Sequence, residues 1–277
     1  MTAGVLSRPV APDPEPLPAA ALDSHCHLDM MGAPVAQVLS QAARSGISRF
    51  VTVGTDVPSS AWAADCAAEH DSVVAAVAVH PNGTADAAAG PGGRDGALAR
   101  IAALAALPRV RAVGETGLDY YRDSAPPRVQ QDWFRAHIEI ARATGKALMI
   151  HDREAHEDVL AILAAVGAPE HVIFHCFSGD AAMARKCAAA GYVLSFAGTL
   201  TFANAPGLRE AAAVMPPELV LVETDAPYLA PAPNRGKRNA PAQAAHTLRA
   251  LAAAQGREVA DMCGIVSRNA ERVFGSW

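Results

Sequence analysis

The sequence predicts an α/β protein, a single (β/α)8 barrel of the TIM type. Two observations support this fold class. Strand-like runs rich in β-branched residues alternate with helix-length segments from residue 22 onward, and there are about eight such runs. The chain has 277 residues, 51% of them hydrophobic, which suits one large core because barrels of this kind reach this length undivided. We therefore expect one barrel domain over residues 21–277.

The first twenty residues differ from the rest of the chain. They carry five prolines and lack the uninterrupted apolar stretch of a secretory signal. We expect residues 1–20 to form a flexible leader.

The predicted strands follow at fairly even intervals: 22–27, 48–53, 73–79, 110–115, 147–151, 171–175, 192–197 and 219–223. Among the intervening segments, 128–145 has an apolar face and ends at Gly145, which indicates a helix. Residues 241–256 and 258–274 predict two further helices. The Gly-rich and small-residue stretch 82–96 predicts an exposed loop.

Charge and cysteine content limit the function classes. The formal net charge is −5, so the chain lacks the basic surplus typical of proteins that hold nucleic acid over a wide surface, and any such contact must be local. Five scattered cysteines predict neither a disulfide framework nor a thiolate zinc site. A reducing, cytoplasmic compartment is expected. No apolar run is long enough to cross a membrane, and the oligomeric state is left open.

Polar residues recur at one place, at or just after the carboxyl ends of the predicted strands. In a (β/α)8 barrel these ends meet on one face, where active sites are built. The residues placed there are His25, His27, Glu115, His151, His175 and Asp225. The sequence therefore predicts that these six side chains converge in one metal-binding mouth.

The His25-Cys26-His27 triplet gives the most specific local signal. Side chains alternate along a strand, so the two imidazoles share a face about 7 Å apart while the thiol points away. Cys26, like Cys176, should then be a small buried hydrophobe. Imidazole and carboxylate ligands without thiolate suit Zn, Mn, Ni or Co, whereas Mg prefers more oxygen ligands. The identity of the metal stays open.

Each residue taken alone has an ordinary structural interpretation. A single buried histidine is more often a hydrogen-bonding core residue than a ligand. Glu115 could be an ion-pair partner, and Asp225 could cap the helix that follows. The metal site is favoured only because all six residues recur at the same place in the strand pattern.

Several further residues are candidates for binding substrate. The loop 234-NRGKRN-239 carries Arg235, Lys237 and Arg238, and loops after the last strands of such barrels often bind phosphate. A solvated basic loop is the alternative. Arg153 could add an anion contact or form an ion pair with Glu154 or Glu157. His80 follows the third strand and either contacts the substrate, supports the metal site or is structural.

Seven segments together resemble the TatD family of metal-dependent hydrolases. They occur in order over nearly the whole chain from residue 22: DSHCHLD (23–29), GETGLDYYR (114–122), QQDWFRAHIEIA (130–141), HDREA (151–155), HCFSG (175–179), ETDAPYLAP (223–231) and RGKRN (235–239). The family usually continues after RGKRN with an acidic and then an aromatic residue, whereas this chain has 240-APAQ-243.

The resemblance implies a TIM barrel of the amidohydrolase type with two divalent metal ions, and a deoxyribonuclease or exonuclease activity on single-stranded DNA. Carried over to this chain, His25, His27 and Asp225 would hold one ion and His151 and His175 the other. Glu115 would bridge the two. Mg, Mn, Zn, Ni and Co are not distinguished by these ligands.

A water molecule activated by the metals would attack the phosphodiester, and Asp225 is the best-placed group to accept its proton. Two alternatives stay open. The same ligands activate water against amides and esters, including the ester of an aminoacyl-tRNA. A non-catalytic nucleic-acid-binding protein is the other alternative, against which the full ligand set and the negative net charge argue.

Overall fold

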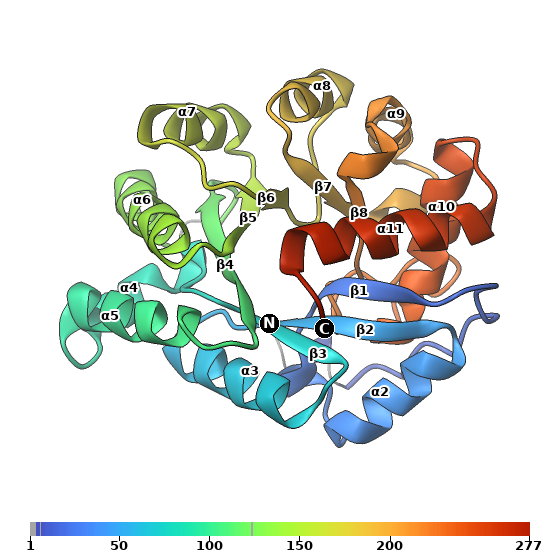
Figure 1. Cartoon of the computed structure of the whole chain (residues 1–277), viewed down its shortest axis with the longest axis horizontal. Coiled ribbons are helices and arrows are strands. Elements are labelled where there is room, and N and C mark those ends of the chain that lie inside the picture. Colours follow the sequence, from blue (N-terminus) through green and yellow to red (C-terminus); the bar gives the residue numbers. More distant parts are fainter. Residues whose placement is uncertain (1–3, 6, 123) are drawn as a thin grey trace. The chain divides into compact units, whose positions relative to one another are not determined.

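The computed structural model describes residues 4–5, 7–122 and 124–277 (Figure 1). Its eight strands form one sheet in which the strands adjoin in chain order. They are β1 (Ala21–Cys26), β2 (Ile47–Val53), β3 (Val73–Val77), β4 (Val110–Asp119), β5 (Ala147–Arg153), β6 (Val172–Phe174), β7 (Val193–Phe196) and β8 (Val220–Val222). All eight predicted runs are strands, and the predicted fold class is confirmed, because this order with intervening helices is that of a (β/α)8 barrel.

The helices are α2 (Val35–Arg44), α3 (Val57–Glu69), α4 (Thr84–Ala89), α5 (Gly93–Ala105), α6 (Pro127–Thr144), α7 (His156–Val166), α8 (Ala181–Ala189), α9 (Pro206–Val214), α10 (Ala244–Ala254) and α11 (Val259–Phe274). The helix predicted over 128–145 is confirmed, and Gly145 ends it in the left-handed conformation at φ 64°. The loop predicted over 82–96 is wrong. Its alanine-rich segment forms α4, because alanine favours a helix more strongly than the flanking glycines oppose it.

The chain forms two compact units. Unit 1 contains the described residues up to Val51, residues 175–272 and Ser276. Unit 2 contains Thr52–Phe174, Val273–Gly275 and Trp277.

Unit 2 is built on the parallel strands β3 to β6. In the register of β4 and β5, Gly117 lies beside His151, and a shift between Val113 and Thr116 marks a bulge in β4. Helices α5, α6 and α7 cover one side of these strands (Figure 1). All residues of β3 are fully buried, as expected for a parallel strand covered on both faces.

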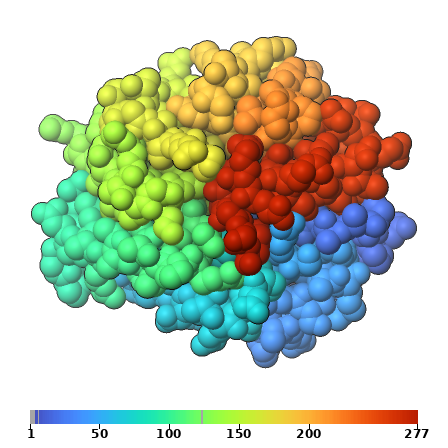
Figure 2. All heavy atoms as spheres, viewed as in Figure 1, coloured from blue at the N-terminus to red at the C-terminus, as the bar shows by residue number. Residues whose placement is uncertain are grey.

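In unit 1 the first and last strands lie side by side, because a parallel bridge joins Cys26 to Ala226 and β7 pairs with β8. Helix α11 packs at the amino-terminal ends of these strands. The Asn269 side chain donates to the Val220 carbonyl at 2.8 Å, and the Ser267 hydroxyl donates to the Ala20 carbonyl at 3.3 Å. This helix occupies the dark red surface in Figure 2. The carboxyl ends of the same strands are thus left for the polar residues.

Part of the segment expected to be a flexible leader is docked on unit 1. The Arg238 amide donates to the Pro9 carbonyl and the Ala11 amide to the Arg238 carbonyl, both at 2.9 Å. The Gln243 side chain donates to the Pro12 carbonyl at 2.8 Å, and Leu17 is buried. Proline-rich composition does not reveal these contacts, because they are made to backbone groups of the segment. Among the described residues, no helix is both long and apolar enough to cross a membrane.

Candidate metal centre

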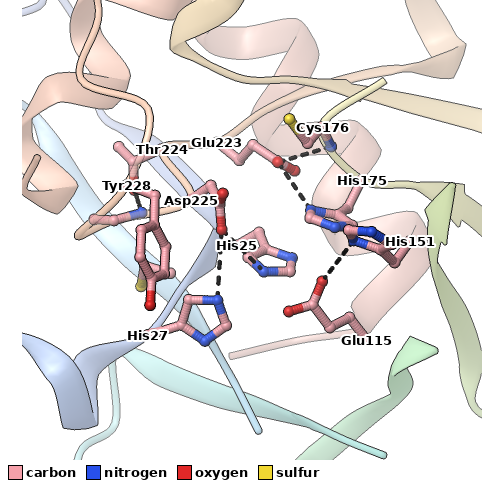
Figure 3. Close-up of polar contacts among 12 residues, drawn as sticks. His25, His27, Glu115, His151, His175, Cys176, Glu223, Thr224, Asp225 and Tyr228 are labelled. Carbon is pink, nitrogen blue, oxygen red and sulfur yellow. Dashed lines mark hydrogen bonds and ion pairs between the residues drawn. The ribbon is translucent and has the colours of Figure 1, made fainter. Parts of the chain in front are cut away.

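His25, His27 and Asp225 lie together at the carboxyl ends of β1 and β8 in unit 1. The Asp225 Oδ1 atom is 3.7 Å from the Nε2 atom of His25 and 3.4 Å from that of His27 (Figure 3). Both histidines are buried. Backbone bonds fix this geometry, since the Asp225 amide donates to the His25 carbonyl and the His27 amide to the Ala226 carbonyl. Asp225 itself is held in the left-handed conformation at φ 55°, which aspartate tolerates better than most residues.

A second group in unit 1 joins His25 to His175 and Glu223. The two imidazole rings stack with centroids 4.0 Å apart. Glu223 is fully buried, and its Oε1 atom accepts from the Cys176 amide at 2.8 Å and lies 3.2 Å from His175 Nδ1. Burial raises the pKa of Glu223, and the hydrogen bond from His175 offsets part of that rise. A carboxylate on Nδ1 leaves Nε2 as the metal-binding nitrogen of His175.

Asp23 forms hydrogen bonds with residues that belong to or adjoin these two groups. It is fully buried and accepts from the Thr224 hydroxyl at 2.5 Å, from the Thr224 amide at 2.9 Å and from the His25 amide at 3.2 Å. Burial raises the pKa of Asp23 well above its ordinary value. These hydrogen bonds connect the backbone of His25 in β1 to Thr224, which lies between Glu223 and Asp225 in the chain.

The candidate group of unit 2 consists of His80, Glu115 and His151. The Glu115 Oε2 atom is 3.3 Å from His151 Nδ1 and 3.7 Å from His80 Nε2. Glu115 was expected at the end of its strand, but β4 continues to Asp119. His80, which we expected among the substrate-binding residues, lies against Glu115 in a potential metal-ligand group.

Asp119 is a further member of this region that the sequence analysis missed. Its Oδ2 atom lies 3.2 Å from His151 Nε2 and accepts from the Asn82 side chain at 2.9 Å. Burial raises the pKa of Asp119, but the hydrogen bonds from His151 and Asn82 outweigh it and hold the pKa far below its usual value. The Asp119 carboxylate therefore holds the His151 ring through its Nε2 atom, while Nδ1 faces Glu115.

The donor atoms fit divalent metal ions. In each of three groups one nitrogen or oxygen atom per residue lies within 4.8 Å of the others: His25, His27 and Asp225; His25, His175 and Glu223; and His80, Glu115 and His151. Metal bonds of about 2.1 Å place two ligands of a tetrahedral ion about 3.4 Å apart, whereas hydrogen-bonded N and O atoms lie at about 2.9 Å. The imidazole–carboxylate separations in the first and third groups, between 3.3 and 3.7 Å, match shared ligation better than direct hydrogen bonding.

The predicted basic residues are distributed over both units. In unit 1, Arg235 lies over the Phe202 ring at 4.2 Å, and Lys237 donates to the Asn234 side chain at 3.1 Å. Arg238 pairs through its backbone with residues 9–11. In unit 2, Arg153 lies 3.9 Å over the ring of Tyr121, which is 60% exposed.

The six predicted ligands are thus placed in the two units separately. His25, His27, His175 and Asp225 are brought together in unit 1, and Glu115 and His151 in unit 2. Convergence of all six in one mouth stays a prediction of the barrel topology. Glu223 could have been found from the sequence, because it ends the predicted strand 219–223, the kind of position at which the other ligands were predicted.

A (β/α)8 barrel with buried imidazole and carboxylate groups at its strand ends is the arrangement that metal-dependent hydrolases use. Comparison with known proteins gives the family. Residues 22–275 match the family described as TatD related DNase, and the chain belongs to that family. It is 47% identical to the metal-dependent hydrolase TatD of Mycobacterium tuberculosis, over 92% of this chain and 97% of that one.

Two further relatives agree. The metal-dependent hydrolase YabD of Bacillus subtilis is 36% identical, over 91% of this chain and 98% of that one. The crystal structure of the TatD homologue YJJV from Escherichia coli superposes with a TM-score of 0.84 at 26% identity, covering 92% of this chain and 97% of that one. The resemblance inferred from the sequence motifs is therefore confirmed.

Proposed function

We propose that this hydrolase cleaves phosphodiester bonds of single-stranded DNA, as a cytoplasmic deoxyribonuclease or exonuclease. The observation that carries the proposal is the position of the basic residues. Arg235 and Lys237 line a pocket of unit 1 whose wall continues through Tyr228, and the Tyr228 ring packs edge-on against the metal-ligand candidate His27 with centroids 6.1 Å apart. Groups that attract phosphate thus lie beside groups that hold metal.

Two divalent ions would be held by the predicted ligands. His25, His27 and Asp225 would bind one ion, His151 and His175 the other, and Glu115 would contact both. When bound, the ions would lower the pKa of a coordinated water and offset the charge of the phosphodiester. The positive charge of the ions would attract the phosphodiester although the net charge of the chain is −5.

Asp225 is the residue proposed to accept the proton of the attacking water. Its side chain is partly exposed, at 15%, whereas the two histidines beside it are almost fully buried. It can therefore reach a water at the mouth of the site while it keeps its contacts with the imidazoles.

Two other carboxylates position the imidazole ligands. Glu223 fixes His175 through Nδ1, and Asp119 contacts His151 through Nε2. Such partners set the orientation and the protonated nitrogen of a ligand histidine, and losing one typically weakens metal binding about 10- to 100-fold.

Anion contacts would come from Arg235, Lys237 and Arg238, with Arg153 as a fourth candidate. Arg235 is already ordered over Phe202, so it loses little conformational freedom when it binds a phosphate oxygen.

The test is a turnover panel with metal-stripped protein to which Mg, Mn or Zn is returned. Its substrates are end-labelled single-stranded DNA, duplex DNA, RNA, a charged transfer RNA and a simple ester. We expect metal-dependent release of nucleotides from single-stranded DNA, loss of activity in His151→Ala, and retention in His171→Ala, which replaces a histidine outside the metal-ligand groups. Turnover of the charged transfer RNA or the ester without DNA cleavage would refute the proposal and identify an amide or ester hydrolase instead. Binding of DNA without turnover of any substrate would also refute it.

A further inference from the structure

A pocket in unit 1 is lined in part by residues that lie before the family match, which begins at residue 22. Val5 and Arg8 form one side of it, and Phe202, Tyr228, Arg235 and Lys237 belong to the remainder. The N-terminal segment therefore contributes to a cavity next to the candidate metal centre.

The segment is held in place by the loop that supplies the basic residues. A parallel bridge pairs Val10 with Arg238, and backbone hydrogen bonds of 2.9 Å join Arg238 to Pro9 and Ala11. The neighbouring loop residues Arg235 and Lys237 line the pocket together with Arg8. Residues 9–11, which directly follow Arg8, are thus held by the basic loop.

The chemistry of the lining indicates an anionic ligand with a flat ring. Three cations, Arg8, Arg235 and Lys237, face a pocket to which no carboxylate contributes among the described residues. Arg235 already lies over the Phe202 ring, and a guanidinium held in this way can receive a nucleobase on its other face. The Tyr228 ring adds an apolar wall.

The size of the pocket suits a ligand no larger than one nucleotide. Its volume is about 270 Å³, below the roughly 300–1,000 Å³ that is usual for ligand pockets. One nucleotide suits such a space better than several. Because Tyr228 both lines the pocket and packs against His27, a nucleotide bound here would be close to a candidate metal ligand.

We propose that this pocket binds a single terminal nucleotide, and that Arg8 from the N-terminal segment contacts its phosphate together with Arg235 and Lys237. Within the proposed function, on which the choice of ligand rests, the pocket would hold the end of the DNA strand and so select substrates with a terminal phosphate. The segment outside the family match would then be a determinant of specificity in this chain.

The test is binding of deoxyadenosine monophosphate, deoxyadenosine and inorganic phosphate to the full chain by calorimetry, at one fixed salt concentration. The variants are Arg8→Ala, Arg8→Lys and Arg257→Ala, which removes an exposed arginine outside the pocket lining. We expect the parent to bind the monophosphate more tightly than the nucleoside. Arg8→Ala should weaken monophosphate binding about tenfold, as expected for one charge-assisted hydrogen bond. Arg8→Lys should weaken it less, and Arg257→Ala should bind like the parent.

Two further measurements distinguish the loss of the Arg8 contact from a general effect on the fold or the reaction. The thermal midpoint and metal content of Arg8→Ala should equal those of the parent, because Arg8 is exposed. On single-stranded DNA, Arg8→Ala should raise KM for substrates with a terminal phosphate and leave kcat unchanged. Equal KM for substrates with and without that phosphate in the parent would overturn the assigned role.

The pocket and the proposed function can fail independently. If Arg8→Ala binds the monophosphate as tightly as the parent does, or if deoxyadenosine binds equally well, the pocket proposal is wrong even where DNA is cleaved. If binding depends on Arg8 while no DNA is cleaved, the nucleotide pocket stands and the proposed reaction is wrong.

Discussion

The stability of the protein below pH 6.5 should depend on His137, a fully buried residue of α6. Its Nε2 atom accepts from the Val79 amide at 3.3 Å, and its Nδ1 atom lies 2.8 Å from the Thr116 hydroxyl. Both nitrogens are therefore used by the neutral ring. Burial, with a smaller contribution from the charge of Arg94, lowers the pKa of His137 from 6.5 to about 3.

The sign and size of the effect follow from this shift. Between pH 6.5 and about 3 the unfolded chain binds a proton at His137 that the folded chain does not, so acidification favours unfolding. At 1.36 kcal/mol per pH unit, lowering the pH from 7 to 5 should cost about 2 kcal/mol from this residue alone. Above pH 6.5 this residue should contribute almost nothing to the pH dependence of stability.

Denaturant unfolding at pH 7, 6 and 5, with chelator present throughout, measures this contribution. His137→Gln should lower stability at pH 7 and show a pH dependence smaller than that of the parent by about 2 kcal/mol over this range. His171→Gln, which replaces a partly exposed histidine, is the control. Equal pH dependence in the parent and in His137→Gln would refute the reasoning.

Two further predictions concern the metal centre. Glu223→Gln should keep the bond from the Cys176 amide but weaken metal binding about 10- to 100-fold, as measured by metal titration of the stripped protein; affinity equal to that of the exposed-surface control Glu218→Gln would count against it. Glu115→Gln should lose more metal and activity than Arg153→Ala, because a shared anionic ligand supports two ions whereas Arg153 contacts substrate at most. Equal metal content in the two variants would argue against bridging.

The strand pattern was predictable because the strands of a covered parallel sheet are continuous apolar runs, as in 73-VVAAV-77. The length of β4 was not. The predicted run ends at Glu115, whereas the strand continues through Gly117, where close packing requires glycine. A Cβ at Gly117 would lie 2.1 Å from the His151 carbonyl oxygen. The strand ends at Asp119, whose carboxylate lies beside His151 of β5.

The site was predictable to the extent that ligands follow strand ends. Residues that act through a ligand were harder to find. Glu223 and Asp119 are buried carboxylates, and their role is recognised only from their contacts with the histidines His175 and His151. These histidines come from other parts of the sequence, so the contacts cannot be read from either segment alone. The docking of the N-terminal segment depends on backbone bonds to residues more than 200 positions away, such as Arg238. Pairings of this kind leave no periodic signal in either segment.

Asp225→Asn tests the claim that Asp225 accepts a proton during metal-dependent hydrolysis of single-stranded DNA. Asparagine tolerates the left-handed backbone of this position, keeps one coordinating oxygen and cannot take the proton. With metal content and DNA binding measured alongside turnover, we predict that the variant retains at least one metal ion, binds single-stranded DNA and cleaves it roughly 10²-fold more slowly. Cleavage at nearly the parent rate, with metal content confirmed, would contradict the claim and move the search for the base to His80.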